Sequence, residues 1–298
     1  MKRFAILFAA ALIGAAPSVP SIAQEAPDVG YAVGAQYDTT HVYVAPEDFD
    51  RFVASFVATF GGTTSKQGVF QVTPTPSQTM SQLILTPAGT VSVFGFKTPI
   101  PYPFGQERTG YLVRDLDAAV ASAMQHGATR LVTIFPDPIG RDALIQWPGG
   151  VTMQLYWHTA TPQYAPLATV PENRIYLTPD AADPFVKSWL GFSKGRILSD
   201  DKAALGAAIS QPGKTYRRIR ITSGYGEMAV IVSDGQLPWP YGRETTGYAV
   251  TDLGATLAKA NAAGAEVLVP AQTDGDRQAA IVRFPGGYIA EIHSGAAR

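Results

Sequence analysis

The stretch from residue 46 to residue 62 has a strong helical pattern. The acids and the proline that helix starts prefer stand at 46–48, and Gly61-Gly62 ends the run. In between, apolar side chains recur every three or four residues, which is the spacing of one helix face. These side chains are Phe49, Phe52, Val53, Phe56, Val57 and Phe60. We expect a helix here whose aromatic stripe packs into the core.

Short apolar or alternating runs around this helix predict strands, separated by proline, glycine and serine turns. The strands expected around the first helix are 41–45, 69–72, 83–85 and 91–96. The same order of elements is then predicted again. It consists of a strand at 109–113, a helix at 115–125 that ends before Gly127, and strands at 131–134, 143–147 and 152–157. A unit of one strand, one helix and three strands is thus predicted twice in this half of the chain.

A duplication organises the whole chain. Residues 101–116 (PYPFGQERTGYLVRDL) match residues 238–253 (PWPYGRETTGYAVTDL) at an offset of 137, with ten identities in sixteen positions. Upstream, residues 40–44 correspond to residues 173–177 at an offset of 133. The unit is therefore expected four times, two per domain. The predicted segments are a signal peptide at 1–23, an N-terminal extension at 24–36, domain 1 at 37–160, a linker at 161–170 and domain 2 at 171–298.

Two short segments, together with this layout, carry a resemblance to a known family. They are YLVRDLDAAV at residues 111–120 and the hairpin WPGGVTMQL at residues 147–155. The chain resembles the vicinal oxygen chelate superfamily, which includes glyoxalase I, bleomycin and fosfomycin resistance proteins and extradiol dioxygenases. The resemblance implies an α+β fold of two tandem glyoxalase-like domains. Each domain would be a pair of βαβββ modules that form a U-shaped mixed sheet, with a divalent metal on its concave face.

The resemblance also implies where metal ligands would lie. The family takes them from the starts of the first and fifth strands and from the eighth strand, and glyoxalases add one from the fourth. The corresponding residues are His41, Arg108 and Gln154 in domain 1, and Arg174, Thr245 and Glu291 in domain 2. Neither domain has a full ligand set by itself. Imidazole and carboxylate suit Mn, Fe, Ni or Zn, so one such divalent metal and no cofactor at all both stay open.

Glyoxalase-like relatives also suggest sites shared between domains. That arrangement would bring His41 and Glu291 together with Thr245, and Arg174 together with Arg108 and Gln154. His41 and Glu291 are then the candidate catalytic residues, as metal ligands or as an acid–base pair, and they should project into a common hollow. The two arginines would grip an oxyanion of the substrate. The alternative for Arg174 is a buried structural ion pair with Glu291.

Other polar side chains are weaker candidates. Glu107 and Glu244 recur one residue before the ligand position, so strand alternation points them to the opposite face and favours a structural role. His126 is expected at the end of a helix, whereas His158 and His293 are expected to line a cavity at most as supporting groups.

Aromatic residues gather in proline-rich loops before the fifth strand of each domain. They either pack over the sheet edge or form a rim that binds an apolar ligand. These residues are Tyr102 and Phe104 in domain 1, and Trp239 and Tyr241 in domain 2, of which the last two are candidate substrate-binding residues.

Composition narrows the class of function. With 23 basic and 24 acidic residues the net charge is −1, which argues against nucleic acid as a partner. The absence of cysteine excludes disulfides, thiol nucleophiles and iron–sulfur clusters. Lys2-Arg3, an apolar run at 4–16 and Ser21-Ile22-Ala23 form a secretory signal pattern. Since a membrane span needs about 20 apolar residues, we expect cleavage, no membrane span afterwards, and a periplasmic or secreted protein.

Together these observations predict an exported enzyme, a lyase, isomerase or oxygenase, that acts on a small oxygen-rich or anionic organic molecule. The alternative is a metal-free protein of the resistance type that binds a small molecule without catalysis. The sequence leaves a monomer and a homodimer equally open, because the duplication supplies within one chain the pairing that single-domain relatives obtain by dimerising.

Overall fold

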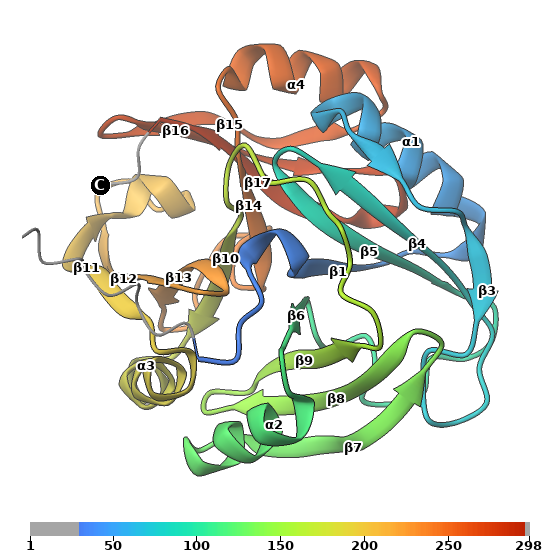
Figure 1. Ribbon diagram of the computed structural model, residues 1–298. Coiled ribbons are helices and arrows are strands. Elements are labelled where there is room, and N and C mark those ends of the chain that lie inside the picture. Colours follow the sequence, from blue (N-terminus) through green and yellow to red (C-terminus); the bar gives the residue numbers. More distant parts are fainter. Residues whose placement is uncertain (1–29, 296–298) are drawn as a thin grey trace, which may run out of the picture.

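Two curved β-sheets lie next to each other in the computed structural model, which describes residues 30–295 (Figure 1). The first sheet has nine strands, the second has eight. The first is built from residues 39–158 and the second from residues 172–294, so the predicted linker at 161–170 lies between them. The predicted signal peptide at 1–23 lies outside the described residues.

Each half of the chain contains two α-helices and several short and long strands. The first half contains β1 (Thr39–Tyr43), α1 (Phe49–Phe60), β2 (Thr63–Thr64), β3 (Gly68–Phe70), β4 (Thr79–Thr86), β5 (Gly89–Phe96), β6 (Thr109–Leu112), α2 (Leu116–Gln125), β7 (Thr129–Asp137), β8 (Gly140–Trp147) and β9 (Val151–His158). The second half contains β10 (Glu172–Leu177), α3 (Pro179–Ser193), β11 (Arg196–Leu205), β12 (Thr215–Ser223), β13 (Gly226–Val232), β14 (Thr245–Ala249), α4 (Leu253–Ala262), β15 (Glu266–Asp274), β16 (Arg277–Arg283) and β17 (Ile289–Ser294). Short 3-10 helices are η1 (Ala35–Tyr37), η2 (Pro46–Asp48), η3 (Gly206–Ile209) and η4 (Pro285–Gly287).

Both sheets join two copies of the repeated unit through their central strands. The strand order is β2-β4-β5-β1-β6-β9-β8-β7 in the first sheet, with β3 beside β4, and β11-β12-β13-β10-β14-β17-β16-β15 in the second. β1 is parallel to β5 and antiparallel to β6, and β10 stands in the same relation to β13 and β14. This topology confirms the predicted α+β fold of two domains, each made of paired modules with a mixed sheet.

The phenylalanine stripe forms α1, and the structure confirms that it is core. Phe52 and Phe56 are fully buried. Phe56 packs against Phe284 and Tyr248 with ring centroids 5.2 Å and 5.3 Å apart. Burying a phenylalanine stabilises a fold by roughly 1.5–3 kcal/mol. Because Phe284 and Tyr248 belong to the second half of domain 2, α1 stabilises the contact between the domains, where it lies beside α4.

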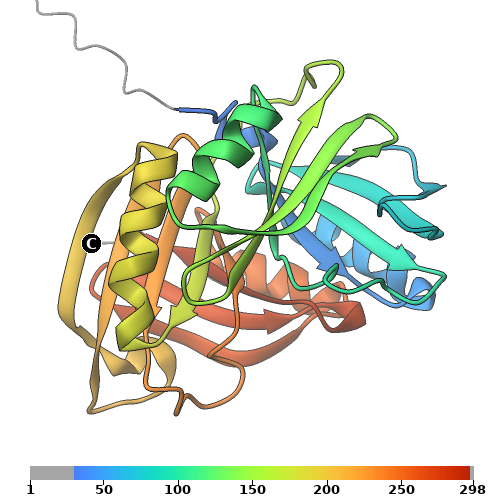
Figure 2. The ribbon, with the colours of Figure 1, turned by 90° about the horizontal axis from the view of Figure 1, so that it is seen from below.

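A second core joins the domains through α2 and α3, which lie next to each other in Figure 2. Trp147 of β8 meets Trp189 of α3 edge to face at a centroid distance of 5.7 Å. The repeat also preserves a helix cap, since Asp115 accepts a hydrogen bond from the first turn of α2 and Asp252 does the same for α4. Helices of both domains therefore take part in the two apolar cores that join the domains.

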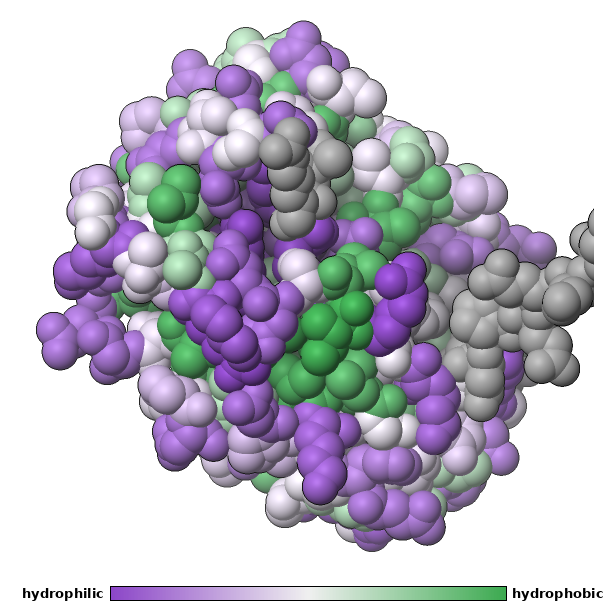
Figure 3. All heavy atoms as spheres, turned by 90° about the vertical axis from the view of Figure 1, so that its left-hand side faces the viewer, coloured by the Kyte–Doolittle hydropathy of each residue, from purple (hydrophilic) through white to green (hydrophobic). Residues whose placement is uncertain are grey.

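The outer face of the second domain is mainly hydrophilic. Figure 3 shows this face, which carries β11 and β12, with hydrophilic side chains around a smaller hydrophobic patch. Within residues 30–295, none of the helices combines the length and the hydropathy that a membrane span requires.

Candidate functional site

The central strands of the two sheets meet through their outward side chains. Thr40 of β1 and Thr246 of β14 are hydrogen bonded, with 3.0 Å between their hydroxyl oxygens. Successive side chains of a strand point to opposite faces. The neighbouring residues, His41 and Thr245, therefore point away from this contact, and His41 lines the hollow of the first sheet.

His41 and Glu291 consequently lie in different hollows. His41 lines the hollow of the first sheet together with Gln154, whereas Glu291 lines that of the second sheet together with Arg174. The residues predicted to form sites shared between the domains therefore do not meet in these hollows; β1, which carries His41, pairs with β6 of its own domain. His41, Glu291 and Thr245 are not brought together, nor are Arg174 and Gln154.

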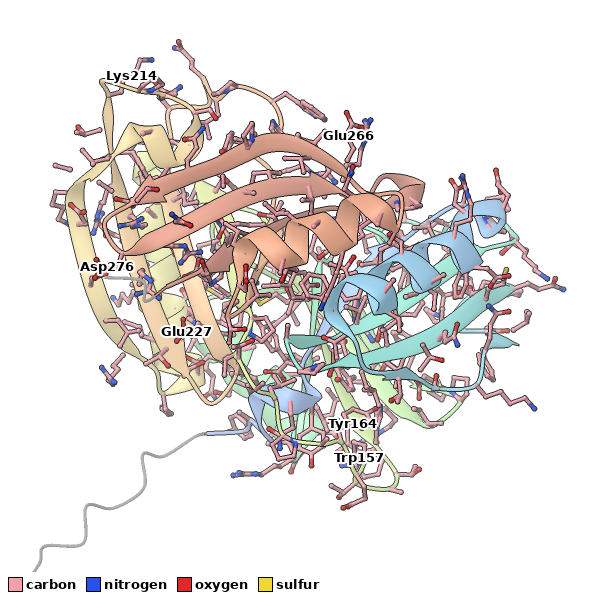
Figure 4. All side chains as sticks on the ribbon, turned by 90° about the horizontal axis from the view of Figure 1, so that it is seen from above. Trp157, Tyr164, Lys214, Glu227, Glu266 and Asp276 are labelled. Atoms are coloured by element: carbon pink, nitrogen blue, oxygen red, sulfur yellow. The ribbon has the colours of Figure 1, made fainter. Side chains whose placement is uncertain are left out.

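The hollow of the first sheet, called the first hollow below, has a volume of about 730 Å³ including its open mouth. Tyr43, Phe94 and Phe96 form an aromatic wall, with Tyr43 stacked on the two phenylalanines at 5.2 Å and 6.2 Å. Tyr164, from the connection between the sheets, also lines the hollow, and Figure 4 labels it beside domain 1. The polar lining is provided mainly by His41, Asp142, Gln154 and His158. An apolar wall with few polar groups is typical of a small-molecule site.

His41 contacts a buried carboxylate. Its Nδ1 lies 3.6 Å from Oε1 of Glu107, which is completely buried. The Tyr43 hydroxyl donates a hydrogen bond to the same carboxylate. Burial, the charge of Glu107 and this hydrogen bond all raise the pKa of Tyr43, so its hydroxyl stays protonated. Two buried atoms of this cluster, Nδ1 of His41 and Oε2 of Glu107, have no hydrogen-bond partner.

The position of Glu107 differs from the sequence prediction. Strand alternation pointed it to the face opposite the ligand position, but β6 begins only at Thr109, so Glu107 lies in the preceding loop, where alternation does not apply. Its counterpart Glu244 instead receives a hydrogen bond from Thr109 across the domain boundary, at 3.3 Å. The same residue of the repeat thus supports His41 in one domain and contacts the partner domain in the other.

A glycine makes room for the His41 ring. A Cβ atom on Gly110 would lie 2.4 Å from Nε2 of His41, well inside contact distance. Gly247 is the corresponding residue of domain 2, and a Cβ there would lie 3.2 Å from Oε1 of Glu291. In both domains this bare backbone lets a polar side chain lie flat against the sheet.

Asp142 supplies a carboxyl group to the first hollow. Burial raises its pKa well above the usual value, the charge of Asp137 raises it further, and a hydrogen bond with Gln154 acts in the opposite direction. Asp142 is therefore poised to be a neutral acid. Burial also lowers the pKa of His158, against the effect of Asp137, which favours a neutral imidazole. Gln154 and His158 lie where the sequence placed them, in the cavity.

The hollow of the second sheet, called the second hollow, has a volume of about 580 Å³ including its open mouth, and its polar lining is a network of ion pairs. Nη2 of Arg277 lies 3.1 Å from Oε1 of Glu172 and 3.1 Å from Nδ1 of His293, and it donates a hydrogen bond to Glu291. Arg174 also pairs with Glu291. All five side chains are buried. For Arg174, the structure therefore shows the ion pair that was the structural alternative.

Charge compensation fixes the protonation of this network. Burial alone would raise the pKa of Glu172, but the charges of Arg277, Arg174, His293 and Arg220 outweigh it and lower the pKa to about 2. Burial and the nearby Arg277 lower the pKa of His293 to about 3. Glu172 stays ionised and His293 neutral near pH 7, so the network is suited to hold its shape rather than to exchange protons.

The remaining predicted residues lie at the edges. Arg108 lies beside Tyr43, with its guanidinium carbon 6.0 Å from the ring centroid. Thr245 faces Arg174 in the pairing of β10 and β14, and Tyr241 lines the second hollow.

Two further aromatic residues of these loops are exposed. Tyr102 and Trp239 are 84% and 63% exposed, as a binding rim requires. Phe104 is buried against Phe135, as the packing alternative required.

The divalent metal that the resemblance implies finds no matching donor set. Within residues 30–295, no group of three or more His, Asp or Glu side chains is placed to hold a metal. In domain 1, an arginine and an amide stand at two of the three ligand positions that the resemblance implies. In domain 2, the guanidinium groups of Arg174 and Arg277 already contact the carboxylates.

Sequence reasoning missed several of the groups described above. Glu107 was considered but assigned to the wrong face. Asp142 stands inside the apolar strand DALIQW, where a buried acid is unusual enough to have been noticed. Arg277 begins an ordinary-looking strand, and nothing in its local pattern indicates that it reaches the second hollow.

Comparisons with solved structures identify the fold. A mutant of 4-hydroxymandelate synthase from Streptomyces coelicolor is 14% identical, with a TM-score of 0.61, covering 90% of this chain and 94% of that one. A 2,3-dioxygenase from a Pseudomonas species is 12% identical, with a TM-score of 0.54 and coverage of 90% and 94%. A Mn(II)-bound glyoxalase from Novosphingobium aromaticivorans is 13% identical, with a TM-score of 0.51 and coverage of 89% and 83%.

No protein-family model and no curated protein sequence matches the chain. The identities to the solved structures are low, so the likeness establishes the fold rather than the reaction. It nevertheless extends over about nine-tenths of the chain and includes both domains. The chain therefore has the fold of the vicinal oxygen chelate superfamily, as two tandem domains.

Proposed function

We propose that this protein is an enzyme that moves a proton on a small organic molecule held in the first hollow, with His41 as the base and Glu107 as its supporting carboxylate. One observation carries the proposal: Nδ1 of His41 and Oε2 of Glu107 are buried beside the hollow without hydrogen-bond partners. Leaving a buried polar group unpaired costs roughly 1–3 kcal/mol. Such a cost is typical of functional sites, where a ligand or a proton completes the arrangement.

Glu107 determines which nitrogen of His41 is basic. A carboxylate near Nδ1 favours a proton on that nitrogen and so leaves Nε2 free to accept one. The separation of 3.6 Å is slightly longer than a hydrogen bond, and catalytic contacts often shorten when substrate binds. The Tyr43 hydroxyl donates a hydrogen bond to Glu107 and so helps to fix the position of this carboxylate beside His41.

Asp142 supplies the matching acid in the same hollow. His41 removes a proton from a carbon next to a carbonyl group, and the C–H electron pair moves toward the carbonyl oxygen. The neutral Asp142 donates a hydrogen bond or its proton to that oxygen. Return of a proton to a neighbouring carbon gives an isomerase reaction, and departure of a leaving group gives a lyase reaction. A carboxyl group whose pKa is raised by burial can act as the acid partner of such a base.

The walls of the hollow indicate the substrate class. Tyr43, Phe94 and Phe96 offer aromatic faces, and Gln154 adds an amide that can orient an oxygen. A flat or apolar molecule with a carbonyl oxygen fits this lining best.

A substrate-independent experiment tests the proposal. Compounds that raise the melting temperature would be incubated with the protein in D₂O, and loss of their C–H signals would be followed by NMR. We expect exchange with the wild type, and a decrease of about 10²–10⁴-fold in His41→Ala and Glu107→Gln, as for general acid–base groups elsewhere. His126→Gln is the matched control, because His126 bonds to Ser122 at the end of α2, outside the hollow. Equal exchange in all four proteins would contradict the proposal.

The second candidate function is binding without catalysis. The continuous aromatic wall of the first hollow favours it, because sequestering a flat molecule needs the wall and not the His41–Glu107 pair. It predicts that the same compounds bind wild type and Glu107→Gln equally and exchange no protons in either.

We further propose that the protein is exported to the periplasm or beyond the cell. The basic start, the apolar run at 4–16 and the small residues before Gln24 support this proposal. Cell fractionation and N-terminal sequencing test it. Export predicts a mature protein that begins near Gln24 outside the cytoplasm, and full-length cytoplasmic protein would contradict it.

A further inference from the structure

A cleft between the two domains is lined by two arginines, one from each domain. It has a volume of about 950 Å³ including its open mouth, and it is lined by both loops that precede the fifth strands. Arg108 comes from domain 1, and Arg243 comes from the equivalent loop of domain 2. The turn at Gly286 and Gly287, between β16 and β17, adds bare backbone to the wall.

The two guanidinium groups are close enough to affect each other. Partial burial lowers the pKa of Arg243, and the positive charge of Arg108 lowers it further. Neither arginine forms an ion pair with any residue of the described chain, whereas buried arginines of the second hollow each meet a carboxylate. Two neighbouring cations without a compensating anion repel each other, and this cost is removed when an anion binds between them.

The carboxyl groups nearest to this cleft are already engaged. Glu107 accepts a hydrogen bond from the Tyr43 hydroxyl and lies beside His41. Glu244 lines the cleft, but it accepts a hydrogen bond from Thr109, and burial raises its pKa to about 7 against the effect of Asn173, Arg108 and Thr109. Glu244 therefore compensates the arginines only in part near neutral pH.

Apolar surface surrounds the charged part of the cleft. Tyr102 and Ile100 belong to its lining and are 84% and 45% exposed, respectively. Exposed aromatic and aliphatic side chains beside paired arginines suit a ligand that is anionic at one end and apolar at the other.

We propose that the cleft between the domains is a binding site for a small organic oxyanion, whose carboxylate or phosphate lies between Arg108 and Arg243 and whose apolar part contacts Tyr102. The site is separate from the first hollow, although His41 and Tyr43 lie in the wall between them. It does not depend on the proton-transfer function, and it uses a residue from each domain, so a single domain cannot form it.

Binding would be measured with acetate, benzoate and sulfate by isothermal calorimetry or by chemical shift titration at constant ionic strength. We expect saturable binding by wild type, with benzoate tighter than acetate because Tyr102 covers the ring. Sulfate is tetrahedral like a phosphate group, whereas acetate carries a carboxylate. The anion that binds with the higher affinity therefore shows which of the two headgroups the arginines prefer. Arg243→Gln should weaken benzoate binding at least about tenfold, as expected for a charge-assisted hydrogen bond. Arg108→Gln should do the same.

Arg51→Gln is the matched control, since it removes the same charge from α1, and Arg51 lines none of the hollows described here. Tyr102→Ala should reduce benzoate binding to the level of acetate while leaving acetate unchanged. Arg243 is exposed, so its variant should fold normally, which a melting curve verifies. Equal binding of benzoate by wild type, Arg243→Gln and Arg51→Gln would overturn the proposal, as would the absence of saturable binding of all three anions to wild type.

Discussion

Replacing Arg277 by methionine should strongly destabilise the protein, because this arginine joins two buried carboxylates. Its guanidinium contacts Glu172 and Glu291, which are 3% and 2% exposed. Methionine keeps the aliphatic part of the side chain but leaves both carboxylates with one cation fewer. Removing one partner of a buried ion pair usually costs about 3–5 kcal/mol. Since Arg174 and Arg220 remain as partners, we expect about 3 kcal/mol, at the lower end of that range.

Arg283→Met is the matched control on the same strand. Arg283 pairs with Glu266 at the surface, where the two side chains are 43% and 58% exposed. Exposed pairs contribute about 0–1 kcal/mol. Urea unfolding at pH 7 would give the free energy of unfolding of each variant.

Acid titration provides a second readout of the same network. The pKa of Glu172 is about 2 in the folded protein, below the ordinary value of 4.5. A depressed pKa contributes stability that is complete above the unfolded value and is lost as the pH falls from about 4.5 through 2. The shift corresponds to roughly 3 kcal/mol for this fully buried group. Arg277→Met should raise the pKa of Glu172 and so flatten the acid dependence. Equal destabilisation by Arg277→Met and Arg283→Met, with unchanged acid dependence, would refute this reasoning.

Three further predictions concern the first hollow and the cleft. Gly110→Ala should displace the His41 ring, because its Cβ would lie 2.4 Å from Nε2. The rate of proton exchange should fall much more than the loss of stability, measured by the melting temperature, can explain; an unchanged exchange rate would show that the ring position is unimportant. Asp142→Asn should stabilise the protein more at pH 8 than at pH 4, because the raised pKa of Asp142 makes its ionisation increasingly unfavourable to the fold as pH rises above its ordinary value; urea unfolding at both pH values tests this, and an equal effect at both would contradict a raised pKa. Sulfate binding in the cleft should weaken between pH 6 and pH 8, because Glu244 ionises over this range and its negative charge beside Arg108 and Glu107 repels the anion. Glu244→Gln should abolish this pH dependence, and a wild-type affinity independent of pH would exclude Glu244 from the site.

Much of the fold followed from local patterns and the repeat. The stripe from Phe49 to Phe60 predicted α1, although residues 46–48, where the start was expected, form a separate 3-10 turn. The helix predicted at 115–125 is α2, which begins one residue later because Asp115 is its N-terminal cap. These features depend on residues close together in the chain, where spacing and capping are decisive. The repeat at an offset of 137 then implied a second domain of the same kind.

The functional site was less predictable, because it depends on which distant strands pair. The sequence allowed His41 to share a hollow with Glu291, and only the pairing of β1 with β6 shows that it does not. Glu107 was assigned by alternation to the wrong face, since its strand starts two residues later. Arg277 and Glu172 are 105 residues apart, and no local pattern indicates that they form an ion pair.

The central claim is that the two hollows have diverged: the first has an aromatic wall beside His41, whereas the carboxylates of the second are engaged in buried ion pairs. A crystallographic fragment screen on the full chain, with compounds that carry a carbonyl group on a flat apolar body, measures this most directly. We predict that bound fragments collect in the first hollow with a polar atom within hydrogen-bond distance of His41, and that the second hollow stays free of them. Fragments that instead displace Arg277 in the second hollow, or that avoid His41 altogether, would contradict the account.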